Sequence, residues 1–400
     1  MFFSRTSARS ARLLATVFLT STLLLTAGLG VSWVYAWRMI KASTPAPPEP
    51  LQAQLPAAAP ISPLQVRYQL DVPGRGEIFP SLSANARDYW PVAVLTISNS
   101  SDRPLIQVIS AEITGWSAKA EQKVVIGARE TRVVDVTPDL LPQAYANNEM
   151  RQVTLRVHVT GPGQDFGYSQ KRPVFLHAAT DLFWGSKFSN AQFIARWVTP
   201  HDPAVLRLVS DARQYMPHGR MAGYHLASNV HGNLSQQVRA QVNAVFEAMK
   251  HSGVSYVDSI FTFGNYSGEA QRVRLPRETL SLSSANCIDV SVAFASAMEN
   301  LGMMPVIVIV PGHAFAGVRL GPDAQQILYV DLTVLPNGTF AQAIARANHW
   351  LKSVPTDRVL MIDISAARAL GIYPMPDPIE EIARFRDKGM GVEQSRAGSN

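Results

Sequence analysis

The chain has a single cysteine, Cys287, among its 400 residues. One cysteine excludes a disulfide framework within the chain, and it leaves Cys287 without a resolving partner in an oxidising compartment. Charged residues are also scarce, at 16% of the chain against 47% hydrophobic residues. This composition is typical of a globular protein that carries a membrane segment, and the length predicts two or three domains.

Acidic residues are missing from the start of the chain, where the first is Glu49. Five basic residues precede it, namely Arg5, Arg9, Arg12, Arg38 and Lys41. Without these five charges the formal net charge of +6 falls by five, to +1. Because the remaining basic residues are not concentrated on any one segment, the sequence predicts no nucleic-acid partner.

Charge is absent altogether from residues 13–37. At a rise of about 1.5 Å per residue, a helix of this length can cross a hydrocarbon core of about 30 Å. We therefore expect a single-pass transmembrane signal anchor, with residues 1–12 cytoplasmic because the basic flank is slightly stronger on that side. The rest of the chain would then be extracytoplasmic, and periplasmic in a Gram-negative cell. The alternative is a cleaved signal peptide, since Val34-Tyr35-Ala36 resembles a cleavage site, but the apolar region is much longer than such peptides need.

Three further segments differ in composition. Residues 38–63 are rich in Pro and Ala, which favours an extended polyproline linker. Residues 64–178 show short alternating strands, clearest where Val153, Leu155 and Val157 share one face. About seven such strands predict an immunoglobulin-like β-sandwich, with another small sandwich or barrel as the alternative. No catalytic constellation occurs there, so we expect a spacer or a binding module.

Residues 179–376 have the pattern of an α+β domain, and the tail, 377–400, is expected to be partly disordered. An apolar helix is predicted from residue 288 to 301, followed by a β-branched strand at 305–310. A strand pair at 314–320 and 326–332 comes next, then a helix at 340–351 and a strand at 359–364. The predicted architecture is therefore a central helix that begins at the cysteine and packs on an antiparallel sheet.

Cysteine, histidine and aspartate occur in that order, on the helix start and on the two paired strands. Thiol catalysis needs a nucleophile, a base and a group that orients the base, and Cys287, His313 and Asp331 are candidates for these roles. Asn286 is a good N-cap, so a helix N-terminus should lower the pKa of the Cys287 thiol. Asp289 lies in the first turn, where a carboxylate pairs with free N–H groups, and we expect its role to be structural.

The motifs N-C-I-D, G-H-A-F and V-D-L-T resemble the core of the transglutaminase-like, papain-type superfamily. The matching positions are Cys287 with Asp289, His313 with Ala314 and Phe315, and Asp331 with Thr333. The resemblance is strongest between residues 274 and 333. Phe315 stands where many members have Trp, and Leu332 where many have Pro, so the aromatic wall and the strand end differ from the usual pattern.

This resemblance implies a membrane-anchored thiol enzyme that transfers acyl groups from amide or peptide bonds, with a protein or peptide of the cell envelope as substrate. With water as acceptor it would be a cysteine peptidase or amidase, which we favour, and with an amine a transglutaminase. A non-catalytic envelope scaffold is the alternative from another class. No cofactor is implied. A metal site at His218, His225 and His231 is not favoured, because no cysteine or acidic cluster accompanies them.

Overall fold

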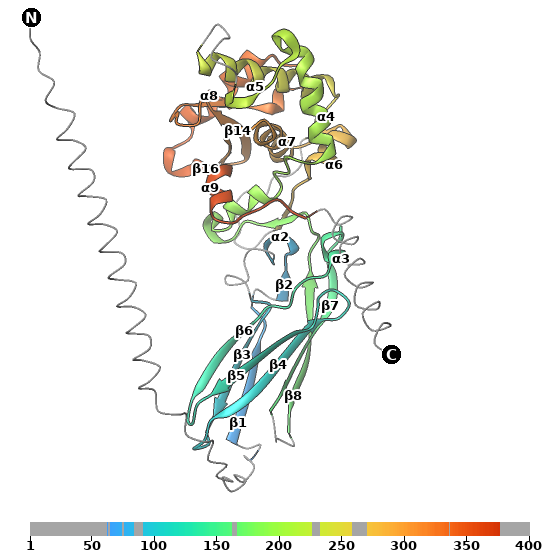
Figure 1. Cartoon of the computed structure of the whole chain (residues 1–400), viewed down its shortest axis with the longest axis vertical. Coiled ribbons are helices and arrows are strands. Elements are labelled where there is room, and N and C mark those ends of the chain that lie inside the picture. Colours follow the sequence, from blue (N-terminus) through green and yellow to red (C-terminus); the bar gives the residue numbers. More distant parts are fainter. Residues whose placement is uncertain are drawn as a thin grey trace, which may run out of the picture. The chain divides into compact units, whose positions relative to one another are not determined.

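The computed structural model describes residue 62 and residues 65–73, 76–83, 91–161, 166–225, 233–257, 270–335 and 337–376. These residues form a mixed α and β structure with five separate sheets. Two of the sheets belong to an N-terminal β part and a four-stranded sheet belongs to the C-terminal part, while two small two-stranded sheets occur between residues 181 and 285. Figure 1 shows the labelled elements in chain order.

The fold class predicted from the sequence is wrong as stated. The transmembrane helix was predicted at residues 13–37, which lie outside the described residues, and no helix in the described ranges is long and apolar enough to cross a membrane. The longest of them, α5 (Leu234–His251), buries only one face and carries Gln and Arg on the other. The most apolar, α7 (Cys287–Asn300), has 14 residues, or about 21 Å at 1.5 Å per residue. Both helices are core helices of a folded domain.

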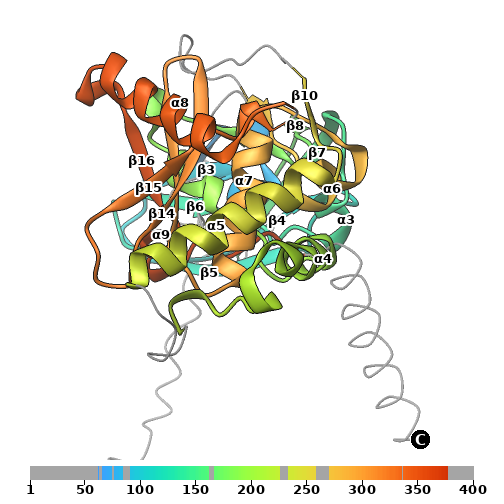
Figure 2. The ribbon, with the colours of Figure 1, turned by 90° about the horizontal axis from the view of Figure 1, so that it is seen from above.

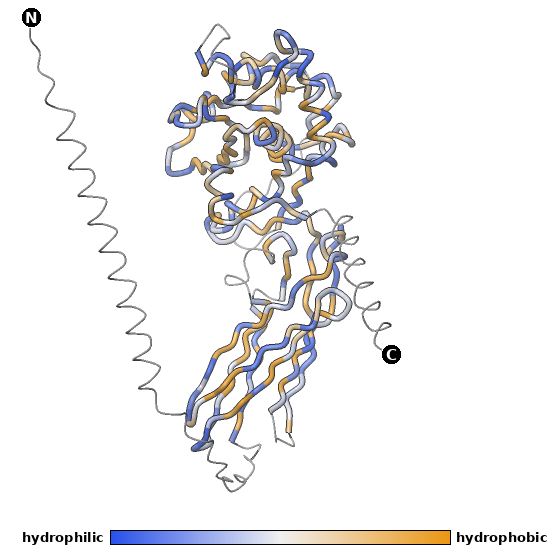
Figure 3. The backbone as a smooth tube through the Cα atoms, viewed as in Figure 1, coloured by the Kyte–Doolittle hydropathy of each residue, from blue (hydrophilic) through white to orange (hydrophobic). Residues whose placement is uncertain are grey.

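The β part consists of eight strands in two sheets. The three-stranded sheet has the order β1-β3-β6, made of Val66–Asp71, Ala93–Asn99 and Thr131–Val136. The five-stranded sheet has the order β2-β8-β7-β4-β5, made of Glu77–Ile78, Tyr168–Leu176, Arg151–Thr160, Leu105–Ile113 and Ala120–Ile126. Apolar and polar residues alternate along these strands (Figure 3), so the two sheets share one apolar core.

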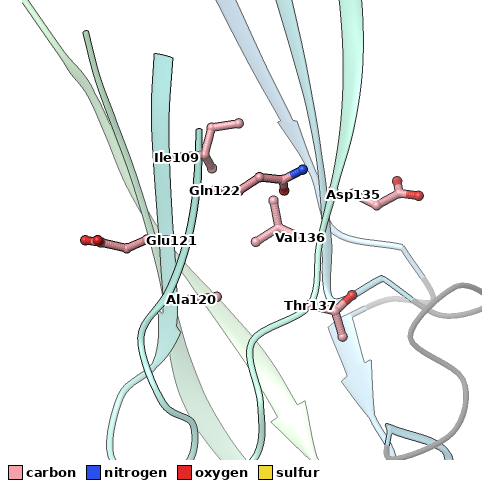
Figure 4. Close-up of a pocket in the computed structure, with 7 residues that line it drawn as sticks. All are labelled: Ile109, Ala120, Glu121, Gln122, Asp135, Val136 and Thr137. Atoms are coloured by element: carbon pink, nitrogen blue, oxygen red, sulfur yellow. The ribbon is translucent and has the colours of Figure 1, made fainter. Parts of the chain in front are cut away.

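This β part differs from the immunoglobulin-like sandwich that we predicted. The short strand β2 pairs in parallel with β8, whereas an immunoglobulin-like domain has two antiparallel sheets. The outermost strands β5 and β6 leave a hollow of about 380 Å³ between the two sheets (Figure 4). The side chains of Ile109, Gln122 and Val136 point into it, whereas the carboxylates of Glu121 and Asp135 point away from it on opposite sides. None of the candidate catalytic residues lines this hollow.

The C-terminal part is built on a four-stranded antiparallel sheet with the order β15-β14-β13-β16. These strands are Ile327–Val330, His313–Arg319, Pro305–Val310 and Leu360–Asp363. The additional strand predicted near residues 359–364 is confirmed, and it pairs with β13. β13 is buried on both faces, which explains its unbroken β-branched sequence.

Helices cover both faces of this sheet. Ile307 and Ile309 of β13 face α7, which is covered in turn by α4 (Pro203–Ala212), α5 and α6 (Pro276–Leu282) (Figure 2). Val306 and Val308 face the other way, toward α8 (Phe340–Ser353). The remaining elements are short: α2 (Pro80–Ser83), α3 (Pro142–Tyr145), β9 (Asp181–Phe183), β10 (Ser255–Tyr256), β11 (Ala270–Arg272), β12 (Ser284–Ala285), α9 (Ile364–Ala369) and several 3₁₀ turns.

Arg368 of α9 joins three segments of the C-terminal part. Its Nε and Nη2 atoms donate to the two carboxylate oxygens of Glu299, each at 2.9 Å. The remaining N–H groups donate to the carbonyls of Ala195, Val198 and Ile372. Because the pair is partly buried and every donor has an acceptor, this guanidinium is a structural junction rather than a surface charge.

We expect Arg368→Met to lower the free energy of unfolding by about 2–4 kcal/mol, since the change leaves the carboxylate of Glu299 and three carbonyls without their donor. Urea denaturation of the full chain measures this. Arg358→Met is the matched control, because Arg358 is exposed and lies nearby in sequence. Equal stability of the two variants would contradict the junction.

Candidate active site

Helix α7 begins at Cys287, and the residues around it fix this start. Oδ1 of Asn286 accepts the N–H groups of Ile288 and Asp289, at 3.1 and 3.0 Å. Oδ2 of Asp289 accepts the N–H of Asn286 in return, which completes a capping box. The N-cap predicted for Asn286 is therefore confirmed. The backbone N–H of Cys287 is not among those that the cap takes.

Asp289 is held by backbone groups on both of its oxygens. Besides the cap, its Oδ1 accepts the N–H of Arg274 at 2.9 Å. Burial raises the pKa of Asp289 to about 6, although the N–H groups of Arg274 and Asn286 lower it. Since this pKa exceeds the ordinary value of 3.8, protonation favours the folded state, and that contribution is lost as the pH rises from about 4 through 6. These contacts are those of a structural residue.

His313 and Asp331 meet at the end of the β14–β15 pair. Asp331 directly follows β15, and its Oδ2 lies 2.9 Å from Nε2 of His313. The Oδ1 atom accepts the hydroxyl and the N–H of Thr333, at 2.7 and 3.1 Å. Burial raises the pKa of Asp331. The hydrogen bond and the charge of His313, together with the two hydrogen bonds from Thr333, lower it by more, so the net pKa is below its ordinary value. An ionised Asp331 accepts the Nε2–H of His313, which makes Nδ1 the basic nitrogen.

Two aromatic rings lie beside the imidazole. Phe315, which the resemblance places in the aromatic wall, has its ring centroid 6.1 Å from that of His313. Trp350 of α8 lies closer, at 4.8 Å, and stacks on the imidazole. Arg346, one helical turn before Trp350, has its Nε atom 3.2 Å from Oδ2 of Asp331. Sequence reasoning missed Trp350 and Arg346; their only signal was the spacing of four along the helix predicted after Asp331.

Cys287 lies on the other side of strand β14. It is 2% exposed and belongs to the apolar cluster on the α7 face of the sheet, with Ala314. His313 and Phe315 alternate with Ala314, and they lie on the α8 side. The backbone N–H of Ala314 points to the thiol, so the residue that contacts the sulfur and the residue that carries the imidazole are consecutive on β14. Among the hydrogen bonds of the described residues there is none between Cys287 and His313.

The low thiol pKa expected from the helix N-terminus is wrong for this structure. Burial raises the pKa of Cys287 to about 12, while the N–H groups of Ala314 and Ile288 lower it by less. The negative charges of Asp331 and Asp289 raise it further. The helix N-terminus therefore acts in the predicted direction, but desolvation of the thiolate is the larger effect.

A hollow flanks the aspartate end of the site. It measures about 490 Å³ and is lined by Thr333, Val334, Asn337, Gly338, Gln342 and Arg346. These residues come from the turn after Asp331 and from the first half of α8. Because Cys287 and His313 are not part of this lining, the hollow reaches the site only through Thr333 and Arg346.

No protein-family model matches the sequence, and a comparison with curated proteins gave no match either. The resemblance to the transglutaminase-like superfamily therefore stays a hypothesis that rests on the motifs around Cys287, His313 and Asp331. What the geometry adds is a buried thiol, an imidazole oriented by a carboxylate, and the capped start of a helix.

We expect iodoacetamide to alkylate Cys287 at least about 100-fold more slowly in the folded chain than in urea at pH 8, because the buried thiol is almost entirely protonated. Intact-mass measurement gives the rate without ambiguity, since the chain has one cysteine. Faster alkylation in the folded chain would mean that the thiol is activated at rest, contrary to its burial.

Proposed function

We propose that the chain is a thiol enzyme that hydrolyses amide or peptide bonds, with Cys287 as nucleophile, His313 as general base and acid, and Asp331 as the residue that orients His313. The observation that carries this proposal is the hydrogen bond of 2.9 Å between His313 Nε2 and Asp331 Oδ2, which leaves Nδ1 as a base next to the strand position that contacts the thiol. The substrate class is a peptide or protein.

The reaction starts when Sγ of Cys287 bonds to the amide carbonyl carbon and its proton moves to Nδ1 of His313. The carbonyl oxygen becomes an oxyanion, for which the backbone N–H of Cys287 is a donor. The C–N bond then breaks and the amine leaves with the proton from His313. Water attacks the resulting thioester, gives a proton to His313, and releases the acid as the C–S bond breaks and the thiol is restored.

Proton transfer needs the sulfur and Nδ1 within hydrogen-bond reach. They share no hydrogen bond in the resting chain, since the thiol contacts β14 from the α7 face and the imidazole lies on the α8 side, so the proposed reaction requires that substrate binding moves one toward the other. A neutral thiol then loses its proton during attack, as the hydroxyl does in a serine triad. We favour water over an amine as the acceptor because water is in great excess over any amine in an aqueous compartment.

A second candidate is a non-catalytic binding module that retains the triad in its scaffold. The burial of the Cys287 thiol at 2% exposure favours it, since a nucleophile must reach its substrate. Incubation of the full chain with a proteome-derived peptide mixture, read by mass spectrometry for new termini, separates the two. A fluorescent primary amine in the same mixture reports transamidation instead of hydrolysis.

Cys287→Ser should abolish cleavage and leave the melting temperature within a few degrees of the parent, because the swap is nearly isosteric while the serine hydroxyl is far harder to deprotonate. Cys287→Ala is the matched variant without any nucleophile. Cleavage that persists at the parental rate in both variants would exclude Cys287 as the nucleophile. No cleavage by the folded parent, with any peptide of the mixture, would favour the binding module.

Asp331→Asn should lower the rate of cleavage roughly 10- to 1000-fold, since an amide can hold the imidazole in the wrong tautomer; comparable changes in serine triads reach about 10⁴-fold. His313→Ala should cost more, because the base itself is lost. The rates of the two variants at pH 7 test this order, with melting temperatures as the control for folding. An Asp331→Asn enzyme as fast as the parent would exclude the orienting role.

A further inference from the structure

Helix α8 contacts the His313–Asp331 pair through two side chains that the proposed reaction does not use. Nε of Arg346 lies 3.2 Å from Oδ2 of Asp331, the same oxygen that accepts from His313. Trp350 stacks on the imidazole with its ring centroid at 4.8 Å. Residues four apart lie on one face of a helix, so α8 presents a cation and an aromatic ring together.

We propose that Arg346 is a positioning residue that lowers the resting reactivity of the Cys287 thiol: it pairs with Oδ2 of Asp331, the oxygen that also contacts His313, and so competes with His313 for this carboxylate until substrate binds. This inference rests on the proposed function. Arg346 acts through Asp331, and within the described residues it forms no hydrogen bond with the thiol or the imidazole.

The physical reason is competition for one carboxylate. A thiolate–imidazolium pair depends on a negative charge beside the imidazolium, and Asp331 supplies that charge. A guanidinium on the same oxygen cancels much of it and repels the imidazolium. Because the Arg346 side chain is 53% exposed, solvent weakens this effect, and we expect it to shift thiol reactivity by about one pH unit rather than by several.

The other charged groups around the site either disfavour the thiolate of Cys287 as well or are paired with a neighbour. Asp289 of α7 disfavours the thiolate, and its own neighbours are Arg274 and Glu278. Asp331 disfavours the thiolate directly but favours the imidazolium, so its two effects oppose each other. Within the described residues, Arg346 and His313 are the basic side chains that pair with Asp331, and the charge of Arg346 weakens the effect of Asp331 on an imidazolium.

The test uses the rate constant of iodoacetamide with Cys287 in the full chain at pH 7, 8 and 9, without substrate. We expect Arg346→Gln to react about tenfold faster than the parent at each pH, which corresponds to a shift of one unit in the thiol pKa. Arg346→Lys keeps the charge and should stay near the parental rate. Lys352→Gln is the matched control, since it removes the same charge from the same helix at an exposed position.

The relay through the triad is tested in the His313→Ala background, where Arg346→Gln should no longer accelerate alkylation. A parental rate in Arg346→Gln, or an equal acceleration with and without His313, overturns the inference. If Arg346→Gln does not fold, Arg346→Met, which keeps the apolar stem of the side chain, serves the same comparison.

The proposed function and this inference fail in different measurements. If no peptide is cleaved by the parent, the proposed function is lost, while the alkylation series still measures the coupling of Arg346 to the thiol. If Arg346→Gln alkylates at the parental rate but the parent cleaves peptides in a Cys287-dependent way, only the inference is lost.

Discussion

The burial of α7 is the constraint on which the C-terminal part depends. Twelve of its 14 residues are buried, since the sheet covers one face and α4, α5 and α6 cover the others. A helix that is apolar all round has no freedom to rotate or slide, because any shift would expose apolar surface or bury a polar cap. Its first residue, Cys287, is therefore fixed in depth and direction. The same burial that positions the thiol also keeps it protonated.

The carboxylate of Asp331 is the second fixed point. It is fully buried, yet it has hydrogen bonds with His313 and with both groups of Thr333, and Arg346 forms an ion pair with it. A buried carboxylate is tolerated only when its oxygens are satisfied in this way, so each donor contributes to the stability of the fold as well as to the site. Oδ2 of Asp331 contacts both the imidazole of His313 and the guanidinium of Arg346. Removal of either side chain therefore changes the electrostatic environment of the other as well as the stability of the fold.

Local pattern was enough to predict much of the C-terminal part. The strand at 305–310 has the predicted bounds, and the helix that starts at Cys287 is capped by Asn286 as predicted, because β-branched runs and capping residues act over a few neighbouring positions. Trp350 and Arg346 could not be predicted, since their contacts depend on how α8 docks on the sheet. The high pKa of Cys287 was missed for the same reason: a helix N-terminus is visible in sequence, whereas the depth of burial is a tertiary property. The parallel pairing of β2 with β8 likewise depends on a strand of two residues that has no periodicity to detect.

A neutral resting thiol has a consequence for the chain's only cysteine. Oxidation to the sulfenic acid proceeds through the thiolate, and a second cysteine normally rescues that product by forming a disulfide. This chain has no second cysteine, so an oxidised Cys287 would have no partner within the chain to restore it. A permanently formed thiolate–imidazolium pair would expose the site to that loss. In the proposed enzyme, a thiol that stays buried and protonated until substrate binds would avoid it, and the burial of α7 together with the proposed effect of Arg346 on Asp331 would favour this state.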